Sequence, residues 1–185
     1  MKLNFLAVIV SLTSILISAN TNAKLISFDS FDNGWYTDDG GHTPSNTNTL
    51  VGTCCGTGNH NAFFNFNLGN QLQDAVINSA SITFLQNGNY SSSDPFEILQ
   101  LFDVTTTPGV TNSVDIYNDL MTGTLYGEAR VSSNSEFTVV LNNLSYADIL
   151  ADSFFSIGAY LSTATGLNQS IFSDSRGVGV ARLNI

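Results

Sequence analysis

Hydrophobic and polar residues alternate along much of this chain in short runs, the pattern of β-strands that bury one face. In residues 60–68, Ala62, Phe64, Phe66 and Leu68 point to one face, and asparagines occupy positions on the other. Residues 96–104 are apolar on both faces, which predicts a central strand. Clear or weaker forms of the pattern also occur in 24–31, 48–52, 78–85, 124–131, 136–142, 154–161, 170–173 and 178–185.

Two segments have helical rather than alternating spacing. In residues 112–121, Val114 and Tyr117 are three positions apart, and Leu120 or Met121 follows at the same interval. Residues 144–151 carry Ser145 and Asp148 at the spacing of a capping box. Both segments are expected to connect strands. The sequence therefore predicts an all-β fold, an antiparallel β-sandwich that is jelly-roll-like, with two short connecting helices. Its phenylalanines are expected to fill the space between the sheets.

The first 23 residues have the order of a secretory signal peptide. Lys2 is followed by an apolar run from Phe5 to Ile17 and by small residues up to Ala23. The run is shorter than the ~20 residues that a membrane span needs. We therefore expect a signal peptide at 1–23, a single β-sandwich domain at 24–185, no membrane span after cleavage, and a secreted protein, extracellular or at the cell surface.

Charge narrows the classes of partner. The chain has 5 Lys and Arg against 15 Asp and Glu, a formal net charge of −10. Nucleic acids and anionic membrane surfaces are held mainly by Lys and Arg, so neither is expected as a partner. Extracellular polysaccharide or matrix is the partner expected instead, and self-association is a further expectation. Gly, Ser, Thr and Asn are expected to carry much of the surface.

The sequence does not predict an enzyme. It lacks the G-x-S-x-G and H-E-x-x-H motifs and a phosphate-binding glycine loop. The only histidines are His42 and His60. A Ser-His-Asp arrangement forms in space rather than in sequence, and a carboxylate pair has too many candidates to be assigned. A secreted hydrolase therefore ranks below two non-catalytic hypotheses, a matrix or surface protein and a carbohydrate-binding module, as the third hypothesis.

Calcium is the ion that the sequence favours, although no cofactor is certain. Residues 29–41 place several Asp and Asn side chains among glycines, and Ca²⁺ binds six to eight oxygen ligands. Asp29, Asp32 and Asn33 are the candidate ligands. The spacing differs from the D-x-D-x-D-G calcium loop. The alternative is an ordinary acidic turn, in which Asp, Asn and Gly serve the backbone.

A carbohydrate site is a second candidate in the same region. Sugars bind aromatic rings through their C–H faces and polar side chains through their hydroxyls. The alternative for Trp35 is an aromatic side chain that covers the end of the sandwich. The candidate ligand-binding residues are Trp35, Tyr36, Asp38, Asp39, His42 and Tyr90.

The only cysteines, Cys54 and Cys55, are adjacent in a glycine-rich segment. Secretion places them where disulfides persist. A bond between neighbours strains the intervening peptide, and Gly52 and Gly56 would ease that strain. A disulfide between Cys54 and Cys55 is the leading hypothesis. Interchain bonds, a zinc or copper site with His60 and His42, and free thiols remain open.

Several strand motifs occur in an order that resembles one bacterial group. They are AFFNFNL, VINSASITF, EILQLFDVTT, IYNDLMTGTLYGEARV, VVLNNLSYADILA and FFSIGAYL, preceded by GWYTDDGGHTPSNTNTLVG. Together they resemble small secreted bacterial β-sandwich proteins of the PEP-CTERM (exosortase-sorted) type, and more distantly the DNRLRE-type modules of bacterial surface proteins. The resemblance does not extend to the sorting tail, because the sequence printed ends in ARLNI.

This resemblance implies a jelly-roll sandwich outside the cytoplasm, linked to the cell surface or the biofilm matrix. It assigns no catalytic residue. The leading hypothesis is therefore a secreted, non-catalytic extracellular matrix or cell-surface-associated protein. The alternative is a carbohydrate-binding module that uses the loops at the end of the sandwich.

Overall fold

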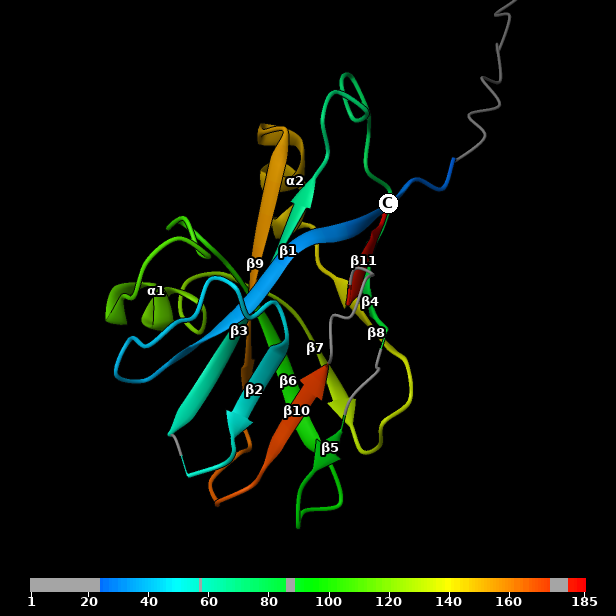
Figure 1. Cartoon of the computed structure of the whole chain (residues 1–185). Helices are drawn as coiled ribbons and strands as arrows, with labels where there is room; N and C mark the ends of the chain where they lie inside the picture. The colour runs from blue at the N-terminus through cyan, green and yellow to red at the C-terminus, as the bar shows by residue number, and fades with distance from the viewer. Residues whose placement is uncertain (1–23, 57, 86–88, 174–179) are drawn as a thin grey trace, which may run out of the picture.

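The computed structural model describes residues 24–56, 58–85, 89–173 and 180–185 (Figure 1). The predicted signal peptide, residues 1–23, lies outside them. The elements are β1 (Ser27–Thr37), β2 (Thr49–Thr53), β3 (Asn59–Asn67), β4 (Ala80–Phe84), β5 (Tyr90–Ser91), β6 (Glu97–Asp103), α1 (Val114–Asp119), β7 (Leu125–Val131), β8 (Phe137–Leu141), α2 (Leu144–Ala151), β9 (Phe154–Leu161), β10 (Ser170–Ser173) and β11 (Ala181–Asn184).

The strands form two antiparallel layers that share β1. The first part of β1 pairs with β11, and that layer continues through β4 to β8. The rest of β1 pairs with β3, and this second layer continues through β9 and β6 to β7. β2, β10 and β5 extend the second layer from the start of β3. Figure 1 shows β11, β4 and β8 beside the remaining strands.

Strands that pair are often far apart in sequence, as in jelly rolls, because connections cross between the layers. The predicted all-β, jelly-roll-like antiparallel sandwich with two short connecting helices is confirmed. The central position predicted for residues 96–104 is also confirmed, since β6 pairs with β7 and β9. No helix in the described part of the chain has the length and apolar character needed to span a membrane.

Alternate residues of the two layers fill the space between them. Phe66 and Leu101 from the second layer and Ile82 from the first are fully buried. Phe64 meets Phe84 across this space, with ring centroids 5.1 Å apart. The alternation read from the sequence therefore places the core correctly, because successive side chains of a strand point to opposite faces.

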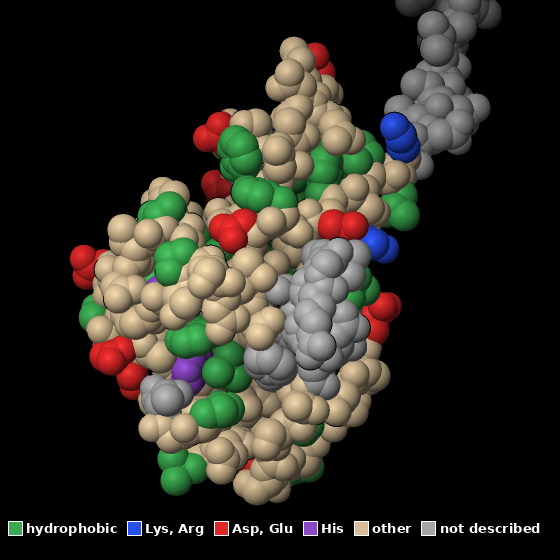
Figure 2. All heavy atoms as spheres, viewed as in Figure 1, with side chains coloured by type: hydrophobic (Ala, Val, Ile, Leu, Met, Phe, Trp, Pro, Cys, Tyr) green, Lys and Arg blue, Asp and Glu red, His purple; other side chains and the backbone are tan. Residues whose placement is uncertain are grey.

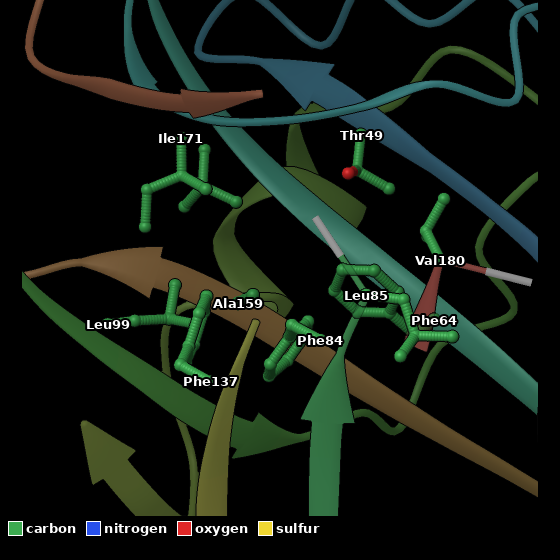
Figure 3. Close-up of a pocket in the computed structure, with 10 residues that line it drawn as sticks. Thr49, Phe64, Phe84, Leu85, Leu99, Phe137, Ala159, Ile171 and Val180 are labelled. Carbon is green, nitrogen blue, oxygen red and sulfur yellow. The ribbon is translucent and has the colours of Figure 1, made fainter. Parts of the chain in front are cut away.

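A small cavity of about 20 Å³ remains where β2 and β10 meet the main core. Figure 3 shows Thr49 and Ile171 on one side of it and the rings of Phe64, Phe84 and Phe137 on the other. Its lining is apolar apart from the hydroxyl of Thr49. A space of this size holds at most one water molecule, so it belongs to the packed core.

A second, smaller core lies on the outer face of β1 and β3. Tyr36 and Phe63 point to this face, where Ile116 and Leu120 at α1 cover them. Gly158 of β9 allows the close approach, because a Cβ atom there would lie 2.4 Å from the carbonyl oxygen of Leu120. The predicted connecting helix at 112–121 thus also covers one face of the second layer.

Two local predictions are wrong. Residues 32–37 are not an acidic turn but continue β1, whose first part falls in the predicted strand 24–31, because this segment pairs with β3. The capping box at 144–151 does not form. Ser145 lies inside α2 and donates its hydroxyl to the carbonyl of Asn142 (2.8 Å), while the carboxylate of Asp148 accepts the hydroxyl of Tyr126.

Candidate functional site

Cys54 and Cys55 are bonded to each other in the turn between β2 and β3. Their Cα atoms are 3.8 Å apart. This arrangement matches the leading hypothesis from the sequence, and it uses both sulfurs, so the structure contains neither the interchain bond nor the thiolate metal site. Cys55 has a φ of 63°, a left-handed backbone conformation that residues other than glycine seldom adopt.

The end of β2 ties this turn to the loop before β10. Gly52 has a φ of 99°, and a Cβ atom there would lie 2.2 Å from the carbonyl oxygen of Gln169. The next residue, Thr53, donates its backbone N–H to that same carbonyl (2.9 Å). Its hydroxyl oxygen accepts the backbone N–H of Gln169 (3.1 Å). Only glycine at position 52 lets the two segments approach this closely.

Gln169 is almost fully buried, and its side chain makes the hydrogen bonds that hold the loop before β10 in place. Its Oε1 accepts the backbone N–H of Thr165 (2.8 Å), and its Nε2 donates to Asp94 (2.6 Å) and Glu97 (3.2 Å). Glu97 is fully buried and also accepts the hydroxyl of Ser92 (2.5 Å). A satisfied polar network of this kind rigidifies its surroundings. It therefore fixes the loop that faces the disulfide.

Between the turn and the loop lies a pocket of about 360 Å³, here called the disulfide pocket. Its volume falls within the range of small-ligand sites. The lining is mostly apolar, and Leu167 is 86% exposed at its edge. Among the described lining residues there is neither a carboxylate nor an imidazole. The lining residues are Thr53, Cys54, Gly56, Gly58, Asn59, Leu167 and Asn168.

The structure separates Trp35 and Tyr36, which the sequence placed in one carbohydrate site. Trp35 is half-buried, and its ring lies edge-on to His60 with centroids 5.0 Å apart. Tyr36 is fully buried against α1 on the opposite face of the layer. The prediction that its side chain is exposed to a ligand is therefore wrong. The separation follows from β1 being a strand, because adjacent residues then face opposite ways.

Of the other predicted carbohydrate-binding residues, Asp38 contacts a residue that lines the disulfide pocket: its carboxylate accepts the backbone N–H of Asn59 (3.4 Å). Asp39 accepts the hydroxyl of Thr37, a bond that lowers the pKa of this exposed carboxyl. His42 stacks on Tyr36 with ring centroids 4.4 Å apart. Tyr90, on β5, packs against the main core.

The three predicted calcium ligands each contact a different protein group. Asp29 forms an ion pair with Arg182 (2.7 Å), and Asp32 accepts from the side-chain amide of Asn65 (2.9 Å). Asn33 donates its side-chain amide to a backbone carbonyl. No group of three or more His, Cys, Asp or Glu side chains that could hold a metal ion occurs in the described ranges. Calcium binding by these residues stays a prediction.

Sequence reasoning missed Leu167 and Asn168 as pocket residues. They lie in the last turn before β10, and the pairing of β10 with β2 places them in the same pocket as Cys54. One local signal was present, a single leucine among polar residues in the segment TGLNQS. Asn168 also has a φ of 61°, which asparagine tolerates better than most residues.

His60 makes the stability of this end of the molecule depend on pH. Its ring is 1% exposed, and burial lowers its pKa, an effect that the Gly52 carbonyl, Asp38 and Asp39 partly offset. As the pH falls, His60 takes up a proton near pH 6.5 in the unfolded chain and only at a lower pH in the folded chain. Through His60, stability is therefore unchanged above about pH 6.5 and falls below it.

We expect the melting temperature to fall more between pH 7 and pH 5 in the wild type than in His60→Gln, because the variant lacks the buried titrating ring. Thermal denaturation of both proteins at both pH values measures this difference. Equal decreases in the two proteins would contradict the prediction.

No protein-family model and no curated protein matches this chain. Among solved structures, it is similar to a chain of the cryo-EM structure of Mud crab tombus-like virus. The alignment has 8% sequence identity and a TM-score of 0.32, and it covers 100% of this chain and 91% of the viral chain. The protein is thus described by its own fold and site, an antiparallel β-sandwich with a pocket beside a disulfide of adjacent cysteines.

Proposed function

We propose that the protein is a secreted, non-catalytic protein of the extracellular matrix or cell surface that binds carbohydrate in the disulfide pocket. The observation that carries this proposal is the pocket itself. Cys54 and Leu167 offer apolar surface, and Asn59 and Asn168 add polar residues to the same lining. Sugars combine apolar C–H faces with hydroxyl groups, so they suit a lining of this composition.

Charge and cysteine chemistry support the extracellular setting. A disulfide persists in oxidising compartments and is rare in the cytosol. The net charge of −10 disfavours nucleic acid and anionic membranes and does not repel an uncharged polysaccharide. Figure 2 shows acidic side chains spread over the visible face, with much of the remaining surface formed by uncharged polar groups and backbone.

A secreted hydrolase has less support. A Ser-His-Asp triad needs a carboxylate at Nδ1 of the histidine. Nδ1 of His42 instead lies 2.9 Å from the carbonyl oxygen of Trp35, and Nδ1 of His60 lies 3.3 Å from that of Gly52. These contacts favour a binding role over proton transfer at either ring.

Replacing Leu167 by alanine is expected to weaken carbohydrate binding about tenfold, because the pocket loses its largest apolar side chain. Stability should hardly change, since this side chain is exposed. The measurement is retention of the protein (residues 24–185) on a panel of insoluble polysaccharides, followed by titration with the best binder. Leu144→Ala, a change of the same type at a residue that is 58% exposed on α2, is the matched control.

The disulfide provides an independent test. The variant Cys54→Ser/Cys55→Ser should also bind more weakly, because the pocket loses a wall. If the wild type is retained on no polysaccharide, the carbohydrate proposal is wrong. Concentration-dependent self-association in sedimentation velocity would then favour a matrix protein that assembles with itself. Equal binding by wild type and Leu167→Ala would remove the disulfide pocket from the site.

A further inference from the structure

Two phenylalanines are exposed where the sequence predicted buried ones. Phe31 is 58% and Phe154 is 56% exposed, and their ring centroids lie 5.9 Å apart. The strand register explains Phe31. Ser30 pairs with Phe66 and Asp32 with Asn65, so Phe31 is the extra residue of a β-bulge. A bulge redirects a side chain, and this one lets the Phe31 ring meet Phe154 on the outer face.

A row of polar groups borders the two rings. Asn65 is paired with Asp32 on one side and with Ser156 on the other, so all three side chains share the outer face of the second layer. The side-chain amide nitrogen of Asn65 donates to the carboxylate of Asp32 (2.9 Å), and the hydroxyl of Ser156 donates to the side-chain oxygen Oδ1 of Asn65 (2.8 Å). The row holds a carboxylate, an amide and a hydroxyl in a fixed order.

A pocket of about 210 Å³ adjoins the rings and the row. Phe154 and Ser156 are part of its lining, together with Asp103, Asp148 and Asp152. A wider hollow of about 510 Å³ also includes Asp152 and extends towards residues 69–75. The exposed rings therefore lie beside concave, polar surface that has room for a ligand.

We propose that Phe31 and Phe154 form a platform that binds a neutral polysaccharide, with the adjoining pocket accepting hydroxyl groups of the same sugar chain. This inference rests on the proposed function in taking a carbohydrate as the ligand, but it concerns a different site. Aromatic rings bind the apolar faces of sugars, and carboxylates accept hydroxyl protons in strong hydrogen bonds. An exposed apolar patch that polar groups surround is typical of an interaction site.

Charge selects the neutral sugar over other occupants. The described lining of the 210 Å³ pocket includes three carboxylates and neither lysine nor arginine. A second copy of the chain carries the same net charge of −10 and would place the same carboxylates against these. An anionic polysaccharide is repelled for the same reason. Figure 2 shows hydrophobic side chains next to acidic ones near α2 and the start of β9.

The platform and the disulfide pocket can be tested separately because they lie at opposite ends of β3. Asn59, at the first residue of β3, lines the disulfide pocket, and Asn67, at its last residue, pairs with Phe154. Eight residues of strand span about 26 Å. Figure 1 shows the turn between β2 and β3 at one end of the molecule and α2 with the start of β9 at the other.

The test is to titrate the protein (residues 24–185) with soluble neutral glucan, galactan and mannan. Isothermal calorimetry measures the affinity for each polymer at low and at high salt. Phe154→Ala is expected to lower the affinity for the best of these polymers about tenfold, and Phe31→Ala by a similar factor. Phe154→Trp should retain binding, because a larger ring remains on the platform. Val140→Ala, a change at a residue that is 71% exposed on β8, should bind as the wild type does.

Salt and the comparison of variants separate the outcomes. Affinity for a neutral sugar should hardly change between low and high salt, whereas an aminated polymer held by the carboxylates would be displaced. Tight binding of aminated polymers alone would overturn the choice of a neutral ligand.

If Leu167→Ala abolishes binding while both phenylalanine variants bind normally, the platform is wrong and the disulfide pocket stands. If the phenylalanine variants lose binding and Leu167→Ala does not, the platform stands and the disulfide pocket is wrong. If the wild type binds none of the polymers, both are wrong.

Discussion

Replacing Phe66 by alanine is expected to lower the free energy of unfolding by about 3–5 kcal/mol. Phe66 is fully buried in β3, the strand that joins β1 to β9 in the second layer. Its ring stacks on Phe155 with centroids 6.2 Å apart. Removing the ring loses apolar burial and leaves a cavity that a two-layer sandwich cannot close by a small shift.

Thermal and urea denaturation measure this effect, and the melting temperature should fall by about 6–20 °C for a chain of this size. Phe154→Ala is the comparison, because it removes the same ring from a neighbouring strand position that is 56% exposed. This second change should cost well under 1 kcal/mol. A loss of similar size in both variants would mean that Phe154 serves the fold, and it would weaken the case for a binding platform.

Replacing Gly52 by alanine is expected to cost about 2–5 kcal/mol and to abolish binding at the disulfide pocket. With a φ of 99°, any other residue is strained at this position. The new Cβ atom would also meet the carbonyl oxygen of Gln169 at 2.2 Å and Cδ1 of Leu161 at 2.8 Å. Backbone cannot give way as a flexible side chain can, so β2 and the loop before β10 must move apart.

Gly56→Ala is the matched control for this prediction. Gly56 also has a positive φ, 70°, but no atom lies within 4 Å of the Cβ position. Only the conformational cost of about 1–2 kcal/mol should remain. Chemical denaturation of both variants gives the two free energies of unfolding. If both variants lose the same stability, the close approach at Gln169 has no energetic role.

Much of the fold could be predicted because strand alternation is a local property. The burial of Ala62, Phe64 and Phe66 follows from their spacing alone, since the side chains of a strand repeat every two residues. The prediction was wrong in residues 32–37, where Asp, Asn and Gly indicated a turn. There β3 supplies hydrogen-bond partners for the backbone, and this pairing overrides the turn propensity of the side chains.

The candidate site could be predicted only in part, because local geometry can be read from the sequence and contacts between distant segments cannot. Adjacent cysteines can be judged from covalent geometry, and the structure joins Cys54 to Cys55 as the leading hypothesis had it. The opposite wall of the pocket could not be found in this way. Leu167 and Cys54 line the same pocket because β10 pairs with β2, although the two segments are far apart in the chain.

The sequence by itself determined the all-β class, the acidic charge and the turn that carries the cysteines, because each depends on composition or on neighbouring residues. Only the tertiary structure decided which side chains meet. It separated Trp35 from Tyr36, brought Leu167 to the disulfide, and placed Phe31 beside Phe154 through a bulge. These contacts depend on strand register, and a shift of one residue sends every side chain of a strand to the other face.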